Sequence, residues 1–444
     1  MFDLLISITS VVVVLGILVL VHEWGHFVVA KLFGVRVEIF SIGFGTRLGG
    51  WRRGPTDYRI SALPLGGYVK MAGDNPAEER QGAPDEFLSK PRWQRAIIAL
   101  AGPAMNLVTA IIIVAILYVV GMPEPAYLQR PAEVGGVMRD SPAEKAGLQP
   151  GDVISQVNGV SVSTWEKALT QTELALSRPE IPVVVERDNE TETLMVQSPG
   201  PRSTVSEVSL LGAPHEPVIV GRVTPDMPAD RAGLKTGDQV LAINDHPVLS
   251  QIQASRLIQD ADGHPLQLLV QRGDRQLRLQ VKPTYGDPRD GFGPRWQIGY
   301  LPRSENTLHS YPFPQAIGRS VAFNVKQTGT LLQLVARLFE AKASIKQLAG
   351  PVQIAQLTGQ AARLGLAPEL QLMGILSLSL AILNLLPIPI LDGGHILMLA
   401  IEGSLRRDLS VAIKERFVQV GLVFLLVIIV IVTYNDVLRI IPGR

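Results

Sequence analysis

Four long stretches without a charged residue constrain the fold of this chain more than any other feature of its sequence. They are residues 4–21, 96–122, 370–391 and 417–435, which are 18, 27, 22 and 19 residues long. Because about 20 consecutive apolar residues cross a bilayer as an α-helix, each stretch predicts one transmembrane helix. The chain average conceals them. Hydrophobic residues make up 47% of the 444 residues, as in soluble proteins, because the section between roughly 123 and 369 carries charge at ordinary density.

The first apolar stretch is predicted to stay in the protein as a membrane anchor. A secretory signal peptide begins with basic residues and ends at a small-residue cleavage site. Here Asp3 precedes the stretch, no such site follows it, and the apolar run continues into His22 and Glu23.

Composition excludes several classes of function. The chain has no cysteine, so disulfides, cysteine nucleophiles and cysteine-based metal sites are ruled out, although this says nothing about the compartment. Its 41 basic and 40 acidic residues leave a formal charge of +1. That balance does not indicate a nucleic-acid partner.

Basic residues cluster in the two short loops that connect successive apolar stretches. Eleven Lys and Arg residues lie within 31–95 and four within 406–416, whereas only Arg439 and Arg444 follow the last stretch. Positively charged loops stay in the cytoplasm. Long translocated domains can escape this rule, but the two short loops agree. Both termini and the long middle section are therefore predicted to lie outside the cytoplasm, which in a bacterium is the periplasm.

The middle section contains an internal repeat. Residues 141–158 match residues 227–244 at an offset of 86 residues without a gap, which is about the size of one small domain. Each copy predicts a short helix ended by Gly147 or Gly233, then a turn and a strand. The pattern resembles the PDZ domains of bacterial proteases. PDZ grooves bind an extended peptide, often by its C-terminus. Two packed domains that bind nothing are the alternative.

A histidine pair at the end of the first apolar stretch predicts a metal site. In His22-Glu23-Trp24-Gly25-His26 the two histidines lie one helical turn apart on the same side of a helix. This arrangement suits zinc, with Glu23 beside the ligands to take a proton from the bound water. Ionisable residues inside an apolar helix are costly and usually mark function. The alternative is a salt-bridged cluster that faces another helix.

The third protein ligand is expected on another apolar stretch, and the candidate is Asp392. His22 lies nine residues before Lys31 and Asp392 lies ten before Glu402, so both sit at similar depth, about 13–15 Å from the cytoplasmic charges. Pro387 and Pro389 break the helix, which makes this agreement approximate. His395 remains a competing ligand.

These motifs together resemble the site-2 protease family. The resemblance rests on His22-Glu23-x-x-His26, on Asn384 followed by Leu391-Asp392-Gly393, and on the PDZ-like insert between the second and third apolar stretches, and it covers nearly the whole chain. Residues 40–45, 64–71 and 348–354 also resemble segments of that family. The resemblance implies that His22, His26 and Asp392 bind Zn²⁺ and that Glu23 is the catalytic glutamate.

Substrate-binding residues are expected near this site. Residues 35–42 and 58–69 predict short strands around Gly66 and Gly67, which could form a small membrane-associated sheet whose edge pairs with an extended substrate. A soluble cytoplasmic hairpin is the alternative. Asn384 is expected to bond substrate backbone, as the family suggests, or to tie helices together. Pro387 and Pro389 free backbone carbonyls near the site.

Two further segments carry weaker expectations. Gly102-Pro-Ala-Met-Asn106 in the second apolar stretch predicts a kink and a packing notch rather than chemistry. Residues 315–340 have apolar residues at near-helical spacing beside Arg319, Lys326 and Arg337, which predicts a helix on the outer membrane face or a plain packed helix.

The predicted fold is a polytopic α-helical membrane protein with four transmembrane helices, a small membrane-associated β-sheet and an extracytoplasmic insert of two PDZ-like α+β domains. The predicted segments are a first transmembrane helix (1–30), a cytoplasmic or re-entrant β segment (31–94), a second transmembrane helix (95–122), PDZ-like domains (123–212 and 213–300), an interfacial helical region (301–369), a third transmembrane helix (370–400), a cytoplasmic loop (401–416), a fourth transmembrane helix (417–436) and an extracytoplasmic tail (437–444).

The predicted function is zinc-dependent hydrolysis of peptide bonds inside transmembrane segments. The resemblance implies a single-span substrate already shortened by another protease, such as an anti-sigma factor, within envelope stress signalling at the bacterial inner membrane. Lipid and a peptide C-terminus at the PDZ-like grooves are further expected partners. A membrane receptor or scaffold with a structural zinc is the main alternative, and a metal transporter is a third. A transporter needs polar ligands across the bilayer, whereas only one cluster is present, and a scaffold has no use for Glu23.

Overall fold

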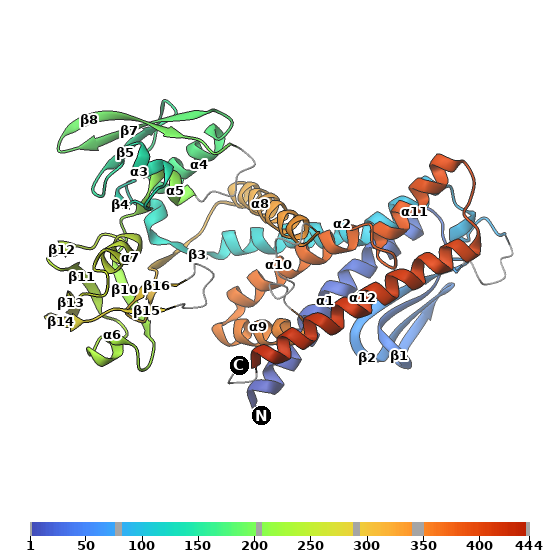
Figure 1. Cartoon of the computed structure of the whole chain (residues 1–444). Coiled ribbons are helices and arrows are strands. Elements are labelled where there is room, and N and C mark those ends of the chain that lie inside the picture. The colour runs from blue at the N-terminus through green and yellow to red at the C-terminus, as the bar shows by residue number, and fades with distance from the viewer. Residues whose placement is uncertain (1, 76–81, 201–206, 287–293, 340–349, 441–444) are drawn as a thin grey trace. The chain divides into compact units, whose positions relative to one another are not determined.

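The computed structural model describes residues 2–75, 82–200, 207–286, 294–339 and 350–440. The chain forms two compact units, as Figure 1 shows. One unit combines Met1–Met122 with Ser310–Arg444, and the other is Pro123–His309. Residues 348, 349 and 441–444, which belong to the expected family segment and the expected tail, lie outside the described residues.

Within the described residues, four helices of the first unit are long and apolar enough to cross a bilayer. They coincide with the four uncharged stretches of the sequence. They are α1 (Phe2–Leu32), α2 (Arg92–Val120), α10 (Leu366–Leu385) and α12 (Val411–Ile440).

Residues 370–400, expected as the third transmembrane segment with a break at Pro387 and Pro389, contain most of α10, a turn and the first part of α11 (Asp392–Leu405). Helix α10 ends at Leu385, and α11 begins after a turn that contains Pro387 and Pro389. Proline has no backbone N–H and disfavours a helical residue before it, so the break follows from the sequence. Helices α11 and α12 are also longer than expected, and they leave only residues 406–410 as the loop between them.

Helix α2 occupies the centre of the first unit and packs against α1, α8, α10 and α11. Its closest approach to α1 is at Gly25, where a methyl group would overlap the backbone carbonyl of Ala101. Small residues allow helix backbones to approach closely inside a membrane. The α1–α2 contact is therefore tight directly beside the histidine pair.

The expected strands form one long, irregular hairpin of β1 (Val37–Arg53) and β2 (Thr56–Met71). Strand β1 pairs on both of its sides, because Phe40 lies opposite Val69 on one side and opposite Tyr58 on the other. Within the described part of the chain, residues 67–71 therefore pair on one side only. Among the described residues no second strand pairs with the other edge of this segment.

Helix α8 (Phe313–Phe339) packs on α2, and α9 (Pro351–Leu364) packs on α1 and α10. Ser320 of α8 donates a hydrogen bond to the carbonyl oxygen of Ile111 at 2.6 Å. On the opposite side of α8 the side chains of Val321, Val325 and Leu332 are exposed. An exposed apolar face of this kind fits the interfacial helix expected over residues 315–340.

The second unit contains two repeats whose sheets share a four-stranded core, β6-β5-β7-β8 in the first and β12-β11-β13-β14 in the second. The first is a sheet of order β6-β5-β7-β8 with a short pair β4–β9, and the second is a sheet of order β14-β13-β11-β10-β17 in which β12 pairs with β11. The helix beside each sheet begins at an N-cap, Thr164 in α4 and Ser250 in α7, again 86 residues apart. The elements of the unit are β3 (Met122–Pro125), β4 (Val134–Gly136), α3 (Pro142–Lys145), β5 (Val153–Val157), β6 (Val160–Ser161), α4 (Trp165–Ala175), β7 (Glu180–Arg187), β8 (Glu190–Gln197), α5 (Glu207–Leu211), β9 (Ala213–Pro214), β10 (Val218–Val223), α6 (Pro228–Arg231), β11 (Gln239–Ile243), β12 (His246–Pro247), α7 (Gln251–Asp260), β13 (Leu266–Arg272), β14 (Arg275–Val281), β15 (Thr284–Gly286), β16 (Arg295–Gln297), β17 (Tyr300–Arg303) and β18 (Asn306–His309).

Each repeat also contains the same buried ion pair. Arg187 contacts Asp152 through two hydrogen bonds of 2.7 Å, and Arg272 contacts Asp238 through two of the same length. Each arginine also donates to the carbonyl oxygen of the glycine that ends the preceding helix, at 2.8 Å for Gly147. The repeated sequence therefore specifies a repeated link between the helix end and the sheet.

Removing one partner of this pair should destabilise its repeat. The Asp238 side chain is only 1% exposed, so Arg272→Ala leaves a buried carboxylate without its charge partner. We expect the free energy of local opening to fall, because the carboxylate loses its charge partner. Hydrogen exchange of the β11 and β13 amides in the full chain measures it. Arg275→Ala, which removes an exposed arginine nearby, is the control and should change nothing.

The pair also makes the repeat sensitive to acid. Burial raises the pKa of Asp238, but hydrogen bonds from Arg272 and from the Lys235 backbone N–H outweigh it and hold this pKa below its ordinary value. The pair's contribution to stability is therefore complete above about pH 4, the pKa in the unfolded chain, and is lost as the pH falls through the lower folded value. An equal acid response in the wild type and in Arg272→Ala would contradict this assignment.

Candidate metal centre

Three of the predicted site residues lie together where α1 meets the start of α11. The Nε2 atoms of His22 and His26 are 3.2 Å apart. The Asp392 carboxylate lies 3.1 Å from Nε2 of His22 and 3.5 Å from Nε2 of His26. One ligand atom from each residue lies within 4.8 Å of the others. Segments 366 residues apart in the sequence thus present two nitrogens and one oxygen to a common point.

The chemistry of this donor set fits a zinc ion. His22 and His26 are 8% and 9% exposed, and the Asp392 side chain is 19% exposed. Two imidazole nitrogens and one carboxylate oxygen are typical ligands of catalytic zinc, whose fourth position stays open for water or substrate. Gathering three such groups inside an apolar helix bundle is costly unless they share a function or an ion.

The turn before α11 positions Asp392 by bringing the backbone very close to α10. A methyl group at Gly393 would overlap the carbonyl oxygens of Leu385 and Leu386, so this position requires glycine. Ile390 has φ of +80°, which is strained for a β-branched residue. Strain of this kind is common at functional sites, where surrounding contacts hold an unfavourable backbone in place.

Helix α2 contacts both histidines on the Nδ1 side of their rings, away from the Nε2 atoms that face Asp392. This contact was not predicted from the sequence. His26 Nδ1 lies 2.7 Å from the carbonyl oxygen of Ile98, and His22 Nδ1 lies 3.3 Å from the side-chain amide of Asn106. A methyl group at Gly102 would overlap the His26 ring and crowd that of His22. The segment expected to be only a kink and packing notch therefore contacts the metal centre. The polar amide of Asn106 in an otherwise apolar stretch was the one signal in the sequence that could have indicated this contact.

Glu23 lies on α1 between the two histidines and is half-buried. It faces a cavity of about 500 Å³ whose lining also includes His22, His26 and Asp392. Three of the five expected substrate-binding residues, Gly66, Gly67 and Asn384, line the same cavity. Besides residues of α1 and α2, its walls thus include part of β2, the end of α10 and the turn that follows α10.

The other two expected substrate-binding residues, Pro387 and Pro389, lie in the turn between α10 and α11. Pro389 faces α12, where a methyl group at Gly421 would overlap it. The structure therefore gives Pro389 a packing contact with α12, and both prolines shape the turn that holds Asp392.

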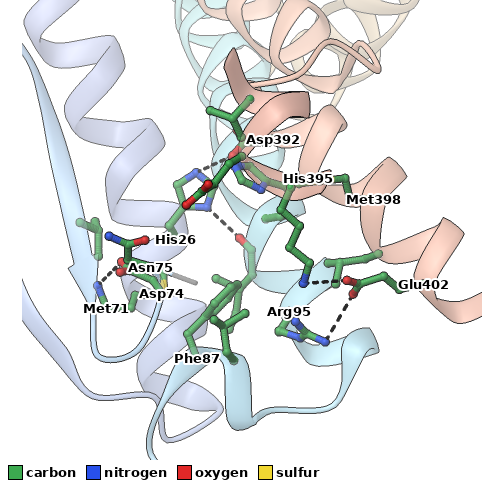
Figure 2. A pocket seen from close by; sticks show the side chains of 18 of the residues that line it. His26, Met71, Asp74, Asn75, Phe87, Arg95, Asp392, His395, Met398 and Glu402 are labelled. Atoms are coloured by element: carbon green, nitrogen blue, oxygen red, sulfur yellow. Dashed lines mark hydrogen bonds and ion pairs between the residues drawn. The ribbon is translucent and has the colours of Figure 1, made fainter. Parts of the chain in front are cut away.

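A second cavity of about 770 Å³ adjoins the first and shares Glu23, His26, Val69 and Asp392 with it. Figure 2 shows His26 and Asp392 at one end of this cavity and Glu402 with Arg95 at the other. Glu402 is 1% exposed and lies 2.7 Å from Lys414 Nζ. This ion pair connects α11 to α12.

His395, the competing ligand, also lines the larger cavity. It lies one turn after Asp392 on α11, as Figure 2 shows. In the described part of the chain, the group of side chains that could hold a metal consists of His22, His26 and Asp392 and does not include it.

The chain is similar to known proteins over almost its whole length. The sequence model of peptidase family M50 matches residues 10–428. Regulator of sigma-E protease RseP of Salmonella typhimurium is 31% identical to the chain, and the protein of that name in Escherichia coli K12 is 30% identical. Each comparison covers 99% of this chain and 100% of the relative. Among solved structures, the PDZ domain of an SdrC-like protein from Listeria monocytogenes covers 20% of this chain and 90% of its own, at 23% identity and a TM-score of 0.18.

The family match spans most of the chain, and the relatives cover it end to end. The four apolar helices make the chain a membrane protein. The chain is a zinc metalloprotease that belongs to peptidase family M50, the site-2 proteases.

Proposed function

We propose that His22, His26 and Asp392 hold one zinc ion and that Glu23 transfers protons during hydrolysis of a peptide bond in a membrane-spanning substrate. The observation that carries this proposal is the convergence of the three ligand atoms beside Glu23, in a cavity whose walls include part of β2. When bound, zinc polarises the scissile carbonyl and activates a water molecule for attack.

Glu23 then has two tasks. It accepts a proton from the attacking water and returns it to the amine that leaves. Its place on α1 between both histidines brings the carboxylate to the same cavity as the ligand atoms. The ligands cannot perform this step, because their lone pairs are committed to the metal.

Substrate binding requires an extended backbone, because the carbonyls of a transmembrane helix are hydrogen-bonded within the helix. We propose that the edge of β2 at Gly66 and Gly67 pairs with the unwound substrate segment. Asn384 on the opposite wall of the cavity replaces further hydrogen bonds that the substrate loses on unwinding. Exposed apolar side chains of the hairpin, Ile42, Phe44, Leu48, Trp51, Ile60 and Leu63, favour its insertion into the membrane.

The orientation proposed from loop charge places both termini and the second unit outside the cytoplasm, in the inner membrane of a bacterium. We propose that the two repeats of the second unit are PDZ domains and that they exclude substrates with a bulky extracytoplasmic domain. The substrate is then a single-span protein already shortened by another protease, such as an anti-sigma factor. Peptide C-termini are proposed ligands of the first repeat in particular, because in the second the Gln259 side chain already bonds both the backbone N–H and C=O of Trp296 beside α7.

A pair of reporter substrates tests the exclusion by size. Both carry the same transmembrane segment, one with a folded extracytoplasmic domain and one with an unfolded polar tail of equal length. We expect the purified protein in lipid vesicles to cleave the tailed reporter much faster, because only the folded domain is too bulky for the repeats. Equal cleavage rates, measured by product accumulation, would contradict the proposal.

A further inference from the structure

One face of α2 supplies the surroundings of both histidines. Ile98, Gly102 and Asn106 are spaced four residues apart, so they lie on one side of the helix. Ile98 meets His26 and Asn106 meets His22, which follows from the opposite directions of α1 and α2. Gly102 lies between them and leaves room for the two rings.

The ring of His22 has a defined orientation in this arrangement. Its Nε2 points to Nε2 of His26 and to the Asp392 carboxylate. Its Nδ1 points the other way, to the amide of Asn106. In a neutral imidazole one ring nitrogen carries a proton and the other has a free lone pair. If Nε2 binds a metal, Nδ1 carries the proton and must donate a hydrogen bond.

Asn106 is placed to accept that hydrogen bond, but with the wrong end of its amide. The side chain is 0% exposed, its Nδ2 faces His22 Nδ1, and its Oδ1 is buried and has no hydrogen-bond partner among the described residues. Two donors therefore face each other while an acceptor beside them has no partner. Half a turn of the amide exchanges two atoms of similar size, brings Oδ1 to His22 Nδ1 and removes the contact between two donors.

We propose that Asn106 is a positioning residue of the metal centre, which accepts a hydrogen bond from His22 Nδ1–H through its Oδ1 and thereby directs Nε2 at the zinc. The inference rests on the proposed function. Histidines that bind a metal almost always donate their other N–H to an acceptor, which fixes the tautomer and the ring. His26 already has such an acceptor, the Ile98 carbonyl oxygen at 2.7 Å. Asn106 provides the corresponding hydrogen-bond acceptor for His22.

The environment of Asn106 is suited to holding the amide in this orientation. The Ser377 hydroxyl of α10 donates to the backbone carbonyl of Asn106 at 2.8 Å, which fixes this turn of α2 against its neighbour. Asn106 also lines the smaller cavity, beside His22 and Asp392.

Zinc affinity of the full-length protein in detergent, measured by competition with a chelator, tests the proposal. Asn106→Leu removes the acceptor at similar volume, and we expect zinc affinity to fall by about 10- to 100-fold. Asn106→Asp keeps an acceptor at the same place and should restore the wild-type affinity. Asn324→Leu is the matched control, because Asn324 is also a buried amide with an unpartnered Oδ1, on α8 and remote from the ligands in sequence. It should bind zinc as the wild type does.

Asn106→Asp decides the question even if Asn106→Leu fails to fold. A carboxylate can only accept, so a donating role for Asn106 predicts that the Asn106→Asp variant binds zinc poorly. Weak zinc binding by Asn106→Asp, or wild-type affinity in Asn106→Leu, would overturn the proposal. Failure of the proposed function has a different signature, because the wild-type protein itself would then bind no zinc and His22→Ala would change nothing.

Discussion

Glu23→Gln should slow hydrolysis by at least about 100-fold while the zinc stays bound. Glutamine has nearly the same shape as glutamate but cannot accept a proton, and general acid–base catalysis contributes about 10²- to 10⁴-fold to a reaction rate. We therefore expect cleavage of a reporter span to fall by a factor within that range. The zinc content should not change, because Glu23 lies outside the group of three ligand atoms. Product accumulation by mass spectrometry and elemental analysis of the purified variant measure the two effects.

Glu38→Gln is the matched control for this experiment. Glu38 lies on β1, where it pairs with Lys70 at 3.5 Å, and its side chain is 40% exposed. This substitution should leave the cleavage rate unchanged. Wild-type activity in Glu23→Gln would show that another group moves the proton, and zinc loss in that variant would show that Glu23 helps to hold the metal.

Asp392→Ala should remove zinc and activity together. The substitution leaves two imidazoles without the negative charge and without the third ligand, and it cannot be compensated by His395, which lies outside the ligand group in the described part of the chain. We expect stoichiometric zinc in the wild type and little in the variant, with no detectable cleavage. Elemental analysis after dialysis against a weak chelator measures the first quantity, and the reporter assay measures the second.

Asp408→Asn serves as the control, because Asp408 is an exposed residue after α11 that pairs with Arg92 at 2.8 Å. It should retain both zinc and activity. An Asp392→Ala variant that keeps zinc would contradict the ligand assignment and would favour His395 as the third ligand.

The sequence predicts the elements of the fold whose signal is local. An uncharged stretch of about 20 residues carries enough hydrophobic free energy to define a span by itself, so α1, α2, α10 and α12 lie where hydropathy places them. The repeat is equally predictable from the sequence, because matching capping residues and turn glycines produce matching helices and strands. The two histidines are predictable for the same reason, since four residues on one helix fix their distance.

Contacts between helices are harder to predict from the sequence. Within residues 92–120 the Asn106 amide is the one signal of which side faces α1, and the contact of the Ile98 carbonyl with His26 emerges only when the helices are packed. Charge counting has a similar limit. Arg95 and Lys414 counted toward the cytoplasmic loops, but both lie close to the buried carboxylate of Glu402, where they connect α2 and α12 to α11. They contribute to packing as well as to orientation.

Asp392 combines a property that the sequence predicts, its depth, with one that depends on helix packing, its orientation. Its depth could be inferred from its distance to Glu402 along the chain, which made it a candidate. Its orientation depends on the turn that contains Ile390 and Gly393, whose close approach to α10 follows no general sequence rule.

The position of the cleaved bond tests most directly whether the protein hydrolyses transmembrane segments in a zinc-dependent reaction. The purified protein is incubated in vesicles with a single-span reporter, with and without prior removal of zinc, and the products are sequenced by mass spectrometry. We expect hydrolysis of a peptide bond within the apolar span. This hydrolysis should be lost when zinc is removed and restored when zinc is added. Cleavage only in the polar flanks, or cleavage inside the span that persists without zinc, would contradict it.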